Sequence, residues 1–260
     1  MFINDLNPVA FNIFEFKIRW YSLAYIFGLI FAFQYGKHII KKNNFFSFER
    51  EILEDFLPYA ILGIIIGGRL GYIIFYDLYY YLNNPIQILY VWQGGMSFHG
   101  GLIGVIFITY YFTKNKNTEL FEFTDLLAII TPIGLFLGRI ANFINSELIG
   151  TPSNLPWSVI FIKIDNIPRH PSQIYEAFLE GILLFLLINL IFKYKKIKGY
   201  VSAFFLILYG LFRIVSEQFR LPDEHLGYIF DFISMGTILS LVMLIIGTMI
   251  LFYVKYKKQN

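Results

Sequence analysis

The sequence predicts an all-α integral membrane protein with seven transmembrane helices, its N-terminus outside the cell and its C-terminus in the cytoplasm. Three observations lead to this fold class: an apolar composition, long apolar runs, and basic clusters in alternate loops. The 260 residues are 57% hydrophobic, 20% aromatic and 15% charged, whereas a soluble domain is about a quarter charged. We expect a single transmembrane domain over residues 1–260.

The same composition excludes several classes of protein. Disorder needs low hydrophobicity and high net charge, and this chain has the reverse. It contains no cysteine, which excludes a disulfide scaffold and a cysteine-ligated metal site. A net charge of +3 is too small to indicate nucleic-acid binding.

Seven apolar runs are candidates for membrane spans, each of which needs roughly 20 residues as a helix. The third run is short and the sixth carries charged residues, so these two are the least regular. The runs cover residues 20–40, 56–75, 98–112, 126–144, 174–192, 201–216 and 229–254.

The orientation follows from the asymmetry of Lys and Arg between the loops. Basic clusters follow spans one, three, five and seven, whereas residues 77–95, on the other side, contain neither Lys nor Arg. Because cytoplasmic loops collect positive charge, the N-terminus is predicted to lie outside. The clusters are Lys37/Lys41/Lys42/Arg50, Lys114/Lys116, Lys193/Lys195/Lys196/Lys198 and Lys255/Lys257/Lys258.

Two connections lie on the outer side of this topology. Residues 145–173 contain four prolines, which predicts an ordered head without a long helix. Residues 77–95 are rich in Tyr and Trp, which favours an interfacial helix that anchors the chain in an aromatic belt.

Three arginines lie inside or at the edge of apolar spans, where each costs about 2.5–3.5 kcal/mol at mid-helix. With the predicted orientation, Arg69, Arg139 and Arg213 all fall in the outer halves of their spans. His99 and Tyr21 begin two further spans at the same side. Five residues from five helices therefore reach a similar depth, which predicts a site toward the outer leaflet.

The sixth span carries a polar stripe made of Arg213, Glu217 and Arg220. Separations of four and three residues place these side chains on one helix face. The stripe indicates either a functional site or an Arg213–Glu217 ion pair that lets a charged helix insert.

The fourth span presents Arg139 and Asn142 on one face, with Glu147 just beyond it. A guanidinium offers a planar fork of donors that suits a phosphate or an ester carbonyl. The alternative role of Asn142 is a hydrogen bond between helices.

Glycines mark two places in the first half of the chain. Gly63, Gly67 and Gly71 repeat every four residues, a spacing that allows two helices to approach closely. Further glycines at 94–95 and 100–101 surround His99. They indicate either backbone close to a ligand or a tight turn, and a histidine there is a candidate proton acceptor near neutral pH.

The segment 138–150 reads GRIANFINSELIG. It resembles the signature of the bacterial prolipoprotein diacylglyceryl transferases, approximately GR-x-x-N-F-x-N-x-E-x-x-G, with every fixed position present. Other stretches resemble motifs of the same family and follow in the same order: 20–21, 67–72, 94–101, 169–176 and 209–223.

The resemblance implies a reaction and its partners. A diacylglyceryl group moves from phosphatidylglycerol to the lipobox cysteine thiol in the signal peptide of a preprolipoprotein, and glycerol-1-phosphate is released. It also implies the bacterial cytoplasmic (inner) membrane, with the active site toward the periplasmic leaflet. We expect no cofactor, no metal and no nucleic acid.

On this reading five residues form the catalytic set. His99 is the preferred general base for the thiol, and Tyr21 orients the lipid or the base through its hydroxyl. Arg139 acts on the phosphate, Arg213 contributes charge to the leaving phosphate, and Glu217 fixes the geometry of Arg213.

Substrate binding extends this set. We expect Arg139 and Asn142 to bind the phosphatidylglycerol head group, with Glu147 and Arg69 as supporting residues.

Two other classes of protein remain open at this point. A secondary transporter of an anionic solute would explain the intramembrane arginines, but no internal repeat is visible. An intramembrane serine protease needs a serine activated by histidine. Ser97 precedes His99 by two residues, although no G-x-S-G element is present.

Overall fold

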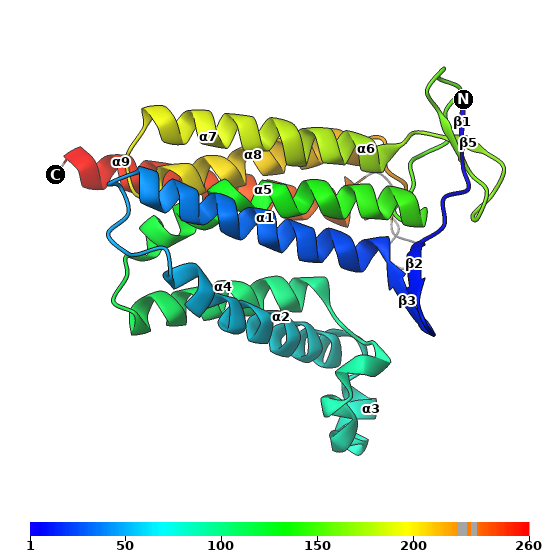
Figure 1. Cartoon of the computed structure of the whole chain (residues 1–260), viewed down its shortest axis with the longest axis horizontal. Coiled ribbons are helices and arrows are strands. Elements are labelled where there is room, and N and C mark those ends of the chain that lie inside the picture. The colour runs from blue at the N-terminus through cyan, green and yellow to red at the C-terminus, as the bar shows by residue number, and fades with distance from the viewer. Residues whose placement is uncertain (223–227, 230–232, 260) are drawn as a thin grey trace. The chain divides into compact units, whose positions relative to one another are not determined.

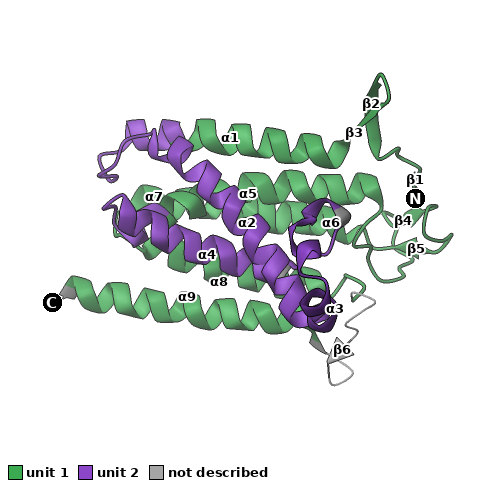
Figure 2. Cartoon of the chain, turned by 90° about the horizontal axis from the view of Figure 1, so that it is seen from below, with its two compact units in different colours: residues 1–36, 124–260 green, residues 37–123 purple. Residues whose placement is uncertain are grey.

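The computed structural model describes residues 1–222, 228–229 and 233–259. The chain separates into two compact units, residues 1–36 with 124–260 (unit 1) and residues 37–123 (unit 2), as coloured in Figure 2. Each unit is described by itself.

Six helical segments in the described part of the chain are long and apolar enough to cross a membrane. They confirm that six of the seven predicted spans are helices of membrane-spanning length and apolarity. The remaining run forms helix α4 (Phe98–Asn115), and its crossing of the membrane stays a prediction. The six segments are Trp20–Lys42, Ile52–Tyr76, Leu120–Asn145, Ser172–Tyr194, Tyr200–Glu217 and Met235–Lys258.

Unit 1 is a bundle of long helices that run alongside one another (Figure 1). Its elements are most of α1 (Trp20–Lys42) and α5 (Leu120–Asn145), followed by α6 (Ser172–Glu176), a π-helix (Ala177–Leu183), α7 (Leu184–Tyr194), α8 (Tyr200–Glu217) and α9 (Met235–Gln259). Helices α8 and α9 pack along each other. A Cβ added to Gly210 would lie 2.8 Å from the Ser240 carbonyl oxygen, so a small residue is needed for this close approach.

One buried carboxylate links α5 to the start of α8. The side chain of Asp125, in α5, accepts hydrogen bonds of 2.7 Å from the backbone N–H groups of Gly199 and Ser202. The first N–H groups of a helix have no partner within the helix. Asp125 supplies that partner and ties α5 to α8.

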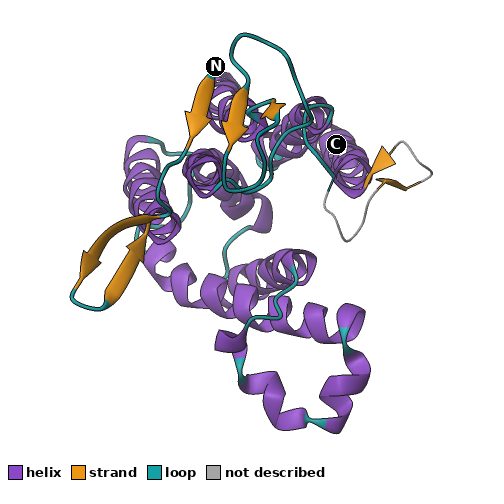
Figure 3. Ribbon diagram, turned by 90° about the vertical axis from the view of Figure 1, so that its right-hand side faces the viewer, coloured by secondary structure: helices purple, strands orange, loops and turns teal. Residues whose placement is uncertain are grey.

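Short strands are present at one end of unit 1, so the expectation of an all-α fold holds for the spans but not for this end (Figure 3). Strand β1 (Phe2–Asn4) pairs in parallel with β4 (Val159–Phe161), and β4 pairs antiparallel with β5 (Pro168–Arg169). Two small antiparallel pairs accompany them, β2 (Val9–Ile13) with β3 (Phe16–Arg19) and β6 (Tyr228–Ile229) with β7 (Ile233–Ser234).

The connection from residue 145 to residue 173 is an ordered segment without a long helix, as predicted. Asp165 accepts a 2.5 Å ion-paired hydrogen bond from Arg169. This guanidinium lowers the pKa of the Asp165 carboxyl below its ordinary value. The fully buried Asn4 donates a 2.7 Å hydrogen bond to the Phe143 carbonyl oxygen, which joins β1 to the last turn of α5.

Unit 2 is built on α2 (Ile52–Tyr76) and α4, which pack along each other. A Cβ on Gly67 would lie 2.4 Å from the Gly100 carbonyl oxygen, and one on Gly71 would lie 2.6 Å from the Gly100 Cα. The predicted role of the glycine repeat in close helix packing is therefore confirmed. Between these helices in the sequence come α3 (Leu78–Asn83) and 3-10 turns at Pro85–Leu89 and Val91–Gln93. A helix was expected in this segment, and the short α3 is present there; its place at the membrane interface stays a prediction.

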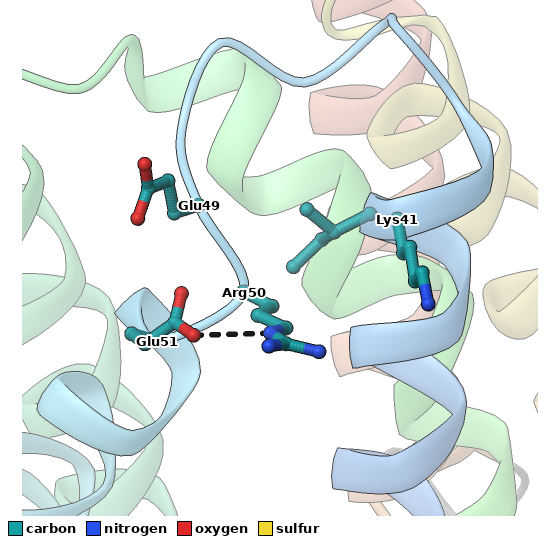
Figure 4. A pocket seen from close by; sticks show the side chains of 5 residues that line it. Lys41, Glu49, Arg50 and Glu51 are labelled. Atoms are coloured by element: carbon teal, nitrogen blue, oxygen red, sulfur yellow. Dashed lines mark hydrogen bonds and ion pairs between the residues drawn. The ribbon is translucent and has the colours of Figure 1, made fainter.

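A surface pocket of about 400 Å³ lies at the other end of unit 2 from Arg69, where α1 ends and α2 begins (Figure 4). It is lined by Ile40, Lys41, Glu49, Arg50 and Glu51. Within it Arg50 donates a 3.0 Å hydrogen bond to the Glu51 carboxylate. Arg69 lies 17 residues into α2, about 25 Å farther along the helix axis at 1.5 Å per residue, so this pocket does not contain it.

Candidate active site

The centre of the candidate site in unit 1 is a pair of arginines held by two buried carboxylates. The guanidinium of Arg139, on α5, lies 3.0 Å from Glu176 and 3.1 Å from Glu180. The guanidinium of Arg213, on α8, lies 2.9 Å and 3.4 Å from the same two carboxylates. Two of the predicted site residues, from different helices, are thus brought together.

Exposure differs between the two kinds of charge. The side chains of Glu176 and Glu180 are 0% exposed, whereas those of Arg139 and Arg213 are 15% and 10% exposed. Buried charges are tolerated when they are paired and hydrogen-bonded. The carboxylates therefore form the buried base of the cluster, and the guanidinium groups form its more accessible side.

The predicted Arg213–Glu217 pair is present, with 2.7 Å between the two groups. Glu217 is the last residue of α8. A Cβ added to Gly236, in the first turn of α9, would lie 2.6 Å from the Glu217 carboxylate. A carboxylate is favoured at the N-terminal end of a helix, here that of α9. Glu217 is therefore held between Arg213 and the start of α9. Arg220, just beyond α8, lies 3.6 Å from Glu176.

A π-helix carries Glu180 into this cluster. Regular i→i+4 bonding gives way at Ala177–Leu183, and such segments are frequent at functional sites. Within it, a Cβ on Gly181 would lie 2.7 Å from the Cβ of Phe136 on α5. This close approach, three residues before Arg139, brings α5 near enough for Arg139 to reach both carboxylates.

The signature segment forms a tight structure at the end of α5. Asn142 and Asn145 donate hydrogen bonds of 2.9 Å and 3.1 Å to the two oxygens of the exposed Glu147 carboxylate. Ser146 and Leu148 have positive φ angles of 60° and 54°. Residues other than glycine seldom adopt this conformation, and it concentrates at functional sites.

Residues from the start of α6 hold this strained segment. The Gln173 side chain donates a 2.6 Å hydrogen bond to the Glu147 carbonyl oxygen, and the Ser172 hydroxyl donates one of 2.9 Å to that of Leu148. Both side chains are fully buried. At Gly150, a Cβ would lie 2.2 Å from the His170 carbonyl oxygen, which explains why the signature ends in glycine.

Tyr21 lies in the first turn of α1, where its hydroxyl accepts a 3.3 Å hydrogen bond from Tyr25. The role of Tyr21 toward the lipid or the base stays a prediction.

Arg69 and His99 belong to unit 2 and are described with it. Arg69 is buried, and its guanidinium donates to backbone carbonyl oxygens of residues 87–95. His99 lies in the first turn of α4, after the N-cap Ser97, whose hydroxyl accepts a 3.3 Å hydrogen bond from the Gly100 N–H. The side chain of His99 is outside the part of the chain that the structure describes, as is Asp223 of the last motif.

Glu176 and Glu180 are not among the site residues predicted from the sequence. The missed signal was the fifth apolar span itself. It carries two carboxylates four residues apart, and an ionisable residue within a membrane span marks a functional site by default.

Comparisons with known proteins agree on one family. The family model described as prolipoprotein diacylglyceryl transferase matches residues 8–253. A phosphatidylglycerol–prolipoprotein diacylglyceryl transferase of Rickettsia bellii is 49% identical over 246 residues, covering 94% of this chain and 93% of the relative. The protein of that name from Rickettsia canadensis is 47% identical over 251 residues, covering 95% and 96% of the two chains. With its signature segment at the end of α5 and this match over nearly its whole length, the chain belongs to the prolipoprotein diacylglyceryl transferase family.

Proposed function

We propose that this protein transfers the diacylglyceryl group of phosphatidylglycerol to the lipobox cysteine thiol of a preprolipoprotein and releases glycerol-1-phosphate. The observation that carries the proposal is the pair Arg139 and Arg213, held on two buried carboxylates beside the signature segment. The names of these relatives support the same activity. They give no support to the alternative of an anionic-solute transporter.

The chemistry sets two demands on the protein. The cysteine sulfur, as thiolate, forms a bond to a glyceryl carbon while the bond from that carbon to a phosphate oxygen breaks. The electron pair leaves with the phosphate, whose charge rises from one negative unit to two. The site must therefore accept a thiol proton and stabilise the additional charge on the phosphate.

Arg139 and Arg213 meet the second demand. A guanidinium stays protonated and matches phosphate oxygens with parallel N–H donors. The two carboxylates and Glu217 hold the guanidinium groups in place before substrate arrives, so little reorganisation is needed as charge develops. Asn142 and Glu147 shape the adjoining turn, and Tyr21 orients the lipid from α1.

We assign the first demand, acceptance of the thiol proton, to His99 as general base. Arginine is a poor proton acceptor at pH 7, whereas the ordinary pKa of histidine lies close to it. The first turn of α4 supplies this residue.

The proposal extends to the setting of the reaction. Seven spans with the N-terminus outside place the signature segment toward the periplasmic leaflet of the inner membrane, where phosphatidylglycerol and an exported lipobox meet. The asymmetry of Lys and Arg along the sequence supports this topology.

The activity is tested with purified protein, phosphatidylglycerol vesicles and a lipobox peptide. We expect a mass gain of one diacylglyceryl group on the peptide cysteine, together with release of glycerol-1-phosphate. Solute uptake without chemistry would favour a transporter, and a shortened peptide would favour a protease.

Variants then test the residue assignments. Arg139→Ala should lower transfer at least 100-fold, because an interaction that stabilises the transition state is lost, while the protein still inserts into membranes. Arg50→Ala, which removes the exposed arginine of Figure 4, is the matched control and should leave transfer unchanged. If His99→Gln kept full transfer, the assignment of the general base would be wrong.

A further inference from the structure

Arg69 has an unusually complete set of partners. All five N–H groups of its guanidinium donate hydrogen bonds to backbone carbonyl oxygens of one short segment, residues 87–95. The acceptors are Ile88 at 3.0 Å, Gly94 at 2.6 Å, Gly95 at 3.1 Å, Gln87 at 2.5 Å and Tyr90 at 3.4 Å.

The charge of Arg69 is also removed from the surface. The residue is 4% exposed, and its guanidinium carbon lies 4.9 Å from the centre of the Tyr81 ring, a cation–π contact. A guanidinium has five donors, and all five are in use. Arg69 therefore has no free donor with which to bind a phosphate directly.

The segment that Arg69 holds leads into α4. Gly95 has a φ of +73°, and a Cβ there would lie 2.8 Å from Nη1 of Arg69. Two residues later, the Ser97 N–H donates a 2.8 Å hydrogen bond to the carbonyl oxygen of Gly68, the residue before Arg69. The α2 turn at 68–69 thus fixes the chain up to the N-cap of α4.

We propose that Arg69 is a positioning residue for the transfer reaction, in place of the supporting role in head-group binding expected from the sequence. By holding residues 87–95 it sets the position of the first turn of α4, and with it the backbone of His99. The inference rests on the proposed function for its effect on rate, because there His99 is the general base. Its structural part, the restraint on residues 87–95, stands separately.

Two substitutions of Arg69 distinguish positioning from binding. Arg69→Lys keeps the positive charge but replaces the planar five-donor fork with three donors, and Arg69→Gln removes the charge. For each purified protein, kcat, the KM for phosphatidylglycerol and the deuterium exchange of the backbone amides of residues 86–97 are measured.

We expect both variants to lower kcat by about 10- to 100-fold, because a displacement of about 1 Å in a catalytic group has effects of this size. The KM for phosphatidylglycerol should stay within about twofold, and the backbone amides of residues 86–97 should exchange faster. A Lys variant with normal kcat and exchange would overturn the proposal. So would a KM raised at least tenfold with kcat and exchange unchanged, since that pattern denotes a lipid ligand.

A third variant keeps the test independent of Arg69 itself. Gly95→Ala leaves the arginine intact but places a methyl group against Nη1, on backbone that L-residues rarely adopt. It should reproduce the fall in kcat and the faster exchange, and normal values would contradict the proposal even if Arg69 variants did not fold. The control is Gly134→Ala, whose Cβ would meet no atom within 4 Å and which should change neither quantity. Unchanged exchange in the Arg69 variants refutes the restraint, whereas full activity of His99→Gln refutes only the assigned base.

Discussion

Glu176 is the residue on which the charged cluster of unit 1 depends most. Its carboxylate lies 3.0 Å from Arg139, 2.9 Å from Arg213 and 3.6 Å from Arg220, and it is fully buried. Removal of one member of a buried ion pair leaves an uncompensated charge and costs about 3–5 kcal/mol.

We therefore expect Glu176→Gln to lower the free energy of unfolding by about 3–5 kcal/mol and to reduce transfer. Glu180→Gln should have a smaller effect on stability, because Glu180 contacts two of these arginines where Glu176 contacts three. Thermal unfolding of the purified variants measures the difference. The control is Glu54→Gln, which removes an exposed partner of Lys37 and should cost under about 1 kcal/mol. Equal effects of Glu176→Gln and Glu54→Gln would contradict this ranking.

The arginines of this cluster are predictable from the sequence, whereas the two carboxylates on α6 and the π-helix are not. Arg139, Arg213 and Glu217 were predicted from their place in apolar spans and their spacing on a helix. Glu176 and Glu180 were not, because the distances that define their role join different helices. Spacing along one helix reports only the neighbours on that helix.

At the level of elements, glycine decides which helices approach each other. The repeat on α2 faces Gly100 and Gly104 of α4, and a Cβ at Gly67 would lie 2.4 Å and 2.8 Å from atoms of these residues. These atoms belong to the backbone, so they cannot move aside as a flexible side chain does.

We expect Gly67→Ala to separate α2 from α4 and to lower thermal stability by several degrees, although alanine favours a helix by about 1 kcal/mol over glycine. Gly134→Ala, in α5, is the matched control. A Cβ at Gly134 meets no atom within 4 Å, so this variant should be as stable as the parent or more so. A Gly67→Ala protein at least as stable as Gly134→Ala would refute the packing argument.

The π-helix at Ala177–Leu183 shows what an element-level pattern does not reveal. Apolar periodicity predicts one continuous span over residues 174–192, and the structure has a continuous helical segment there. The change to i→i+5 bonding within it carries Glu180 and lies against α5. Such a change follows from packing between helices, which the periodicity of a single segment does not contain.

For the molecule as a whole, the sequence predicts an orientation in the membrane that chemical labelling can test. The chain has no cysteine, so a single introduced cysteine is the only thiol available to a membrane-impermeant reagent. We expect Asn154→Cys, in the head, to be labelled in cells with a permeable outer envelope. Lys258→Cys, at the end of α9, should be labelled only after the inner membrane is opened. The reverse pattern would contradict the predicted topology.

The sequence by itself determined the membrane class, six spans that the structure confirms, the glycine packing and the family. These features depend on composition, local periodicity and contiguous motifs, each of which is contained within one segment of the chain. Tertiary structure decided which charges meet. It showed that Glu176 and Glu180 hold Arg139 and Arg213 in unit 1, and that Arg69 is fully occupied by backbone carbonyls in unit 2. The physical reason is that the energy of a buried charge depends on the groups within a few ångströms of it, and most of those groups come from other parts of the chain.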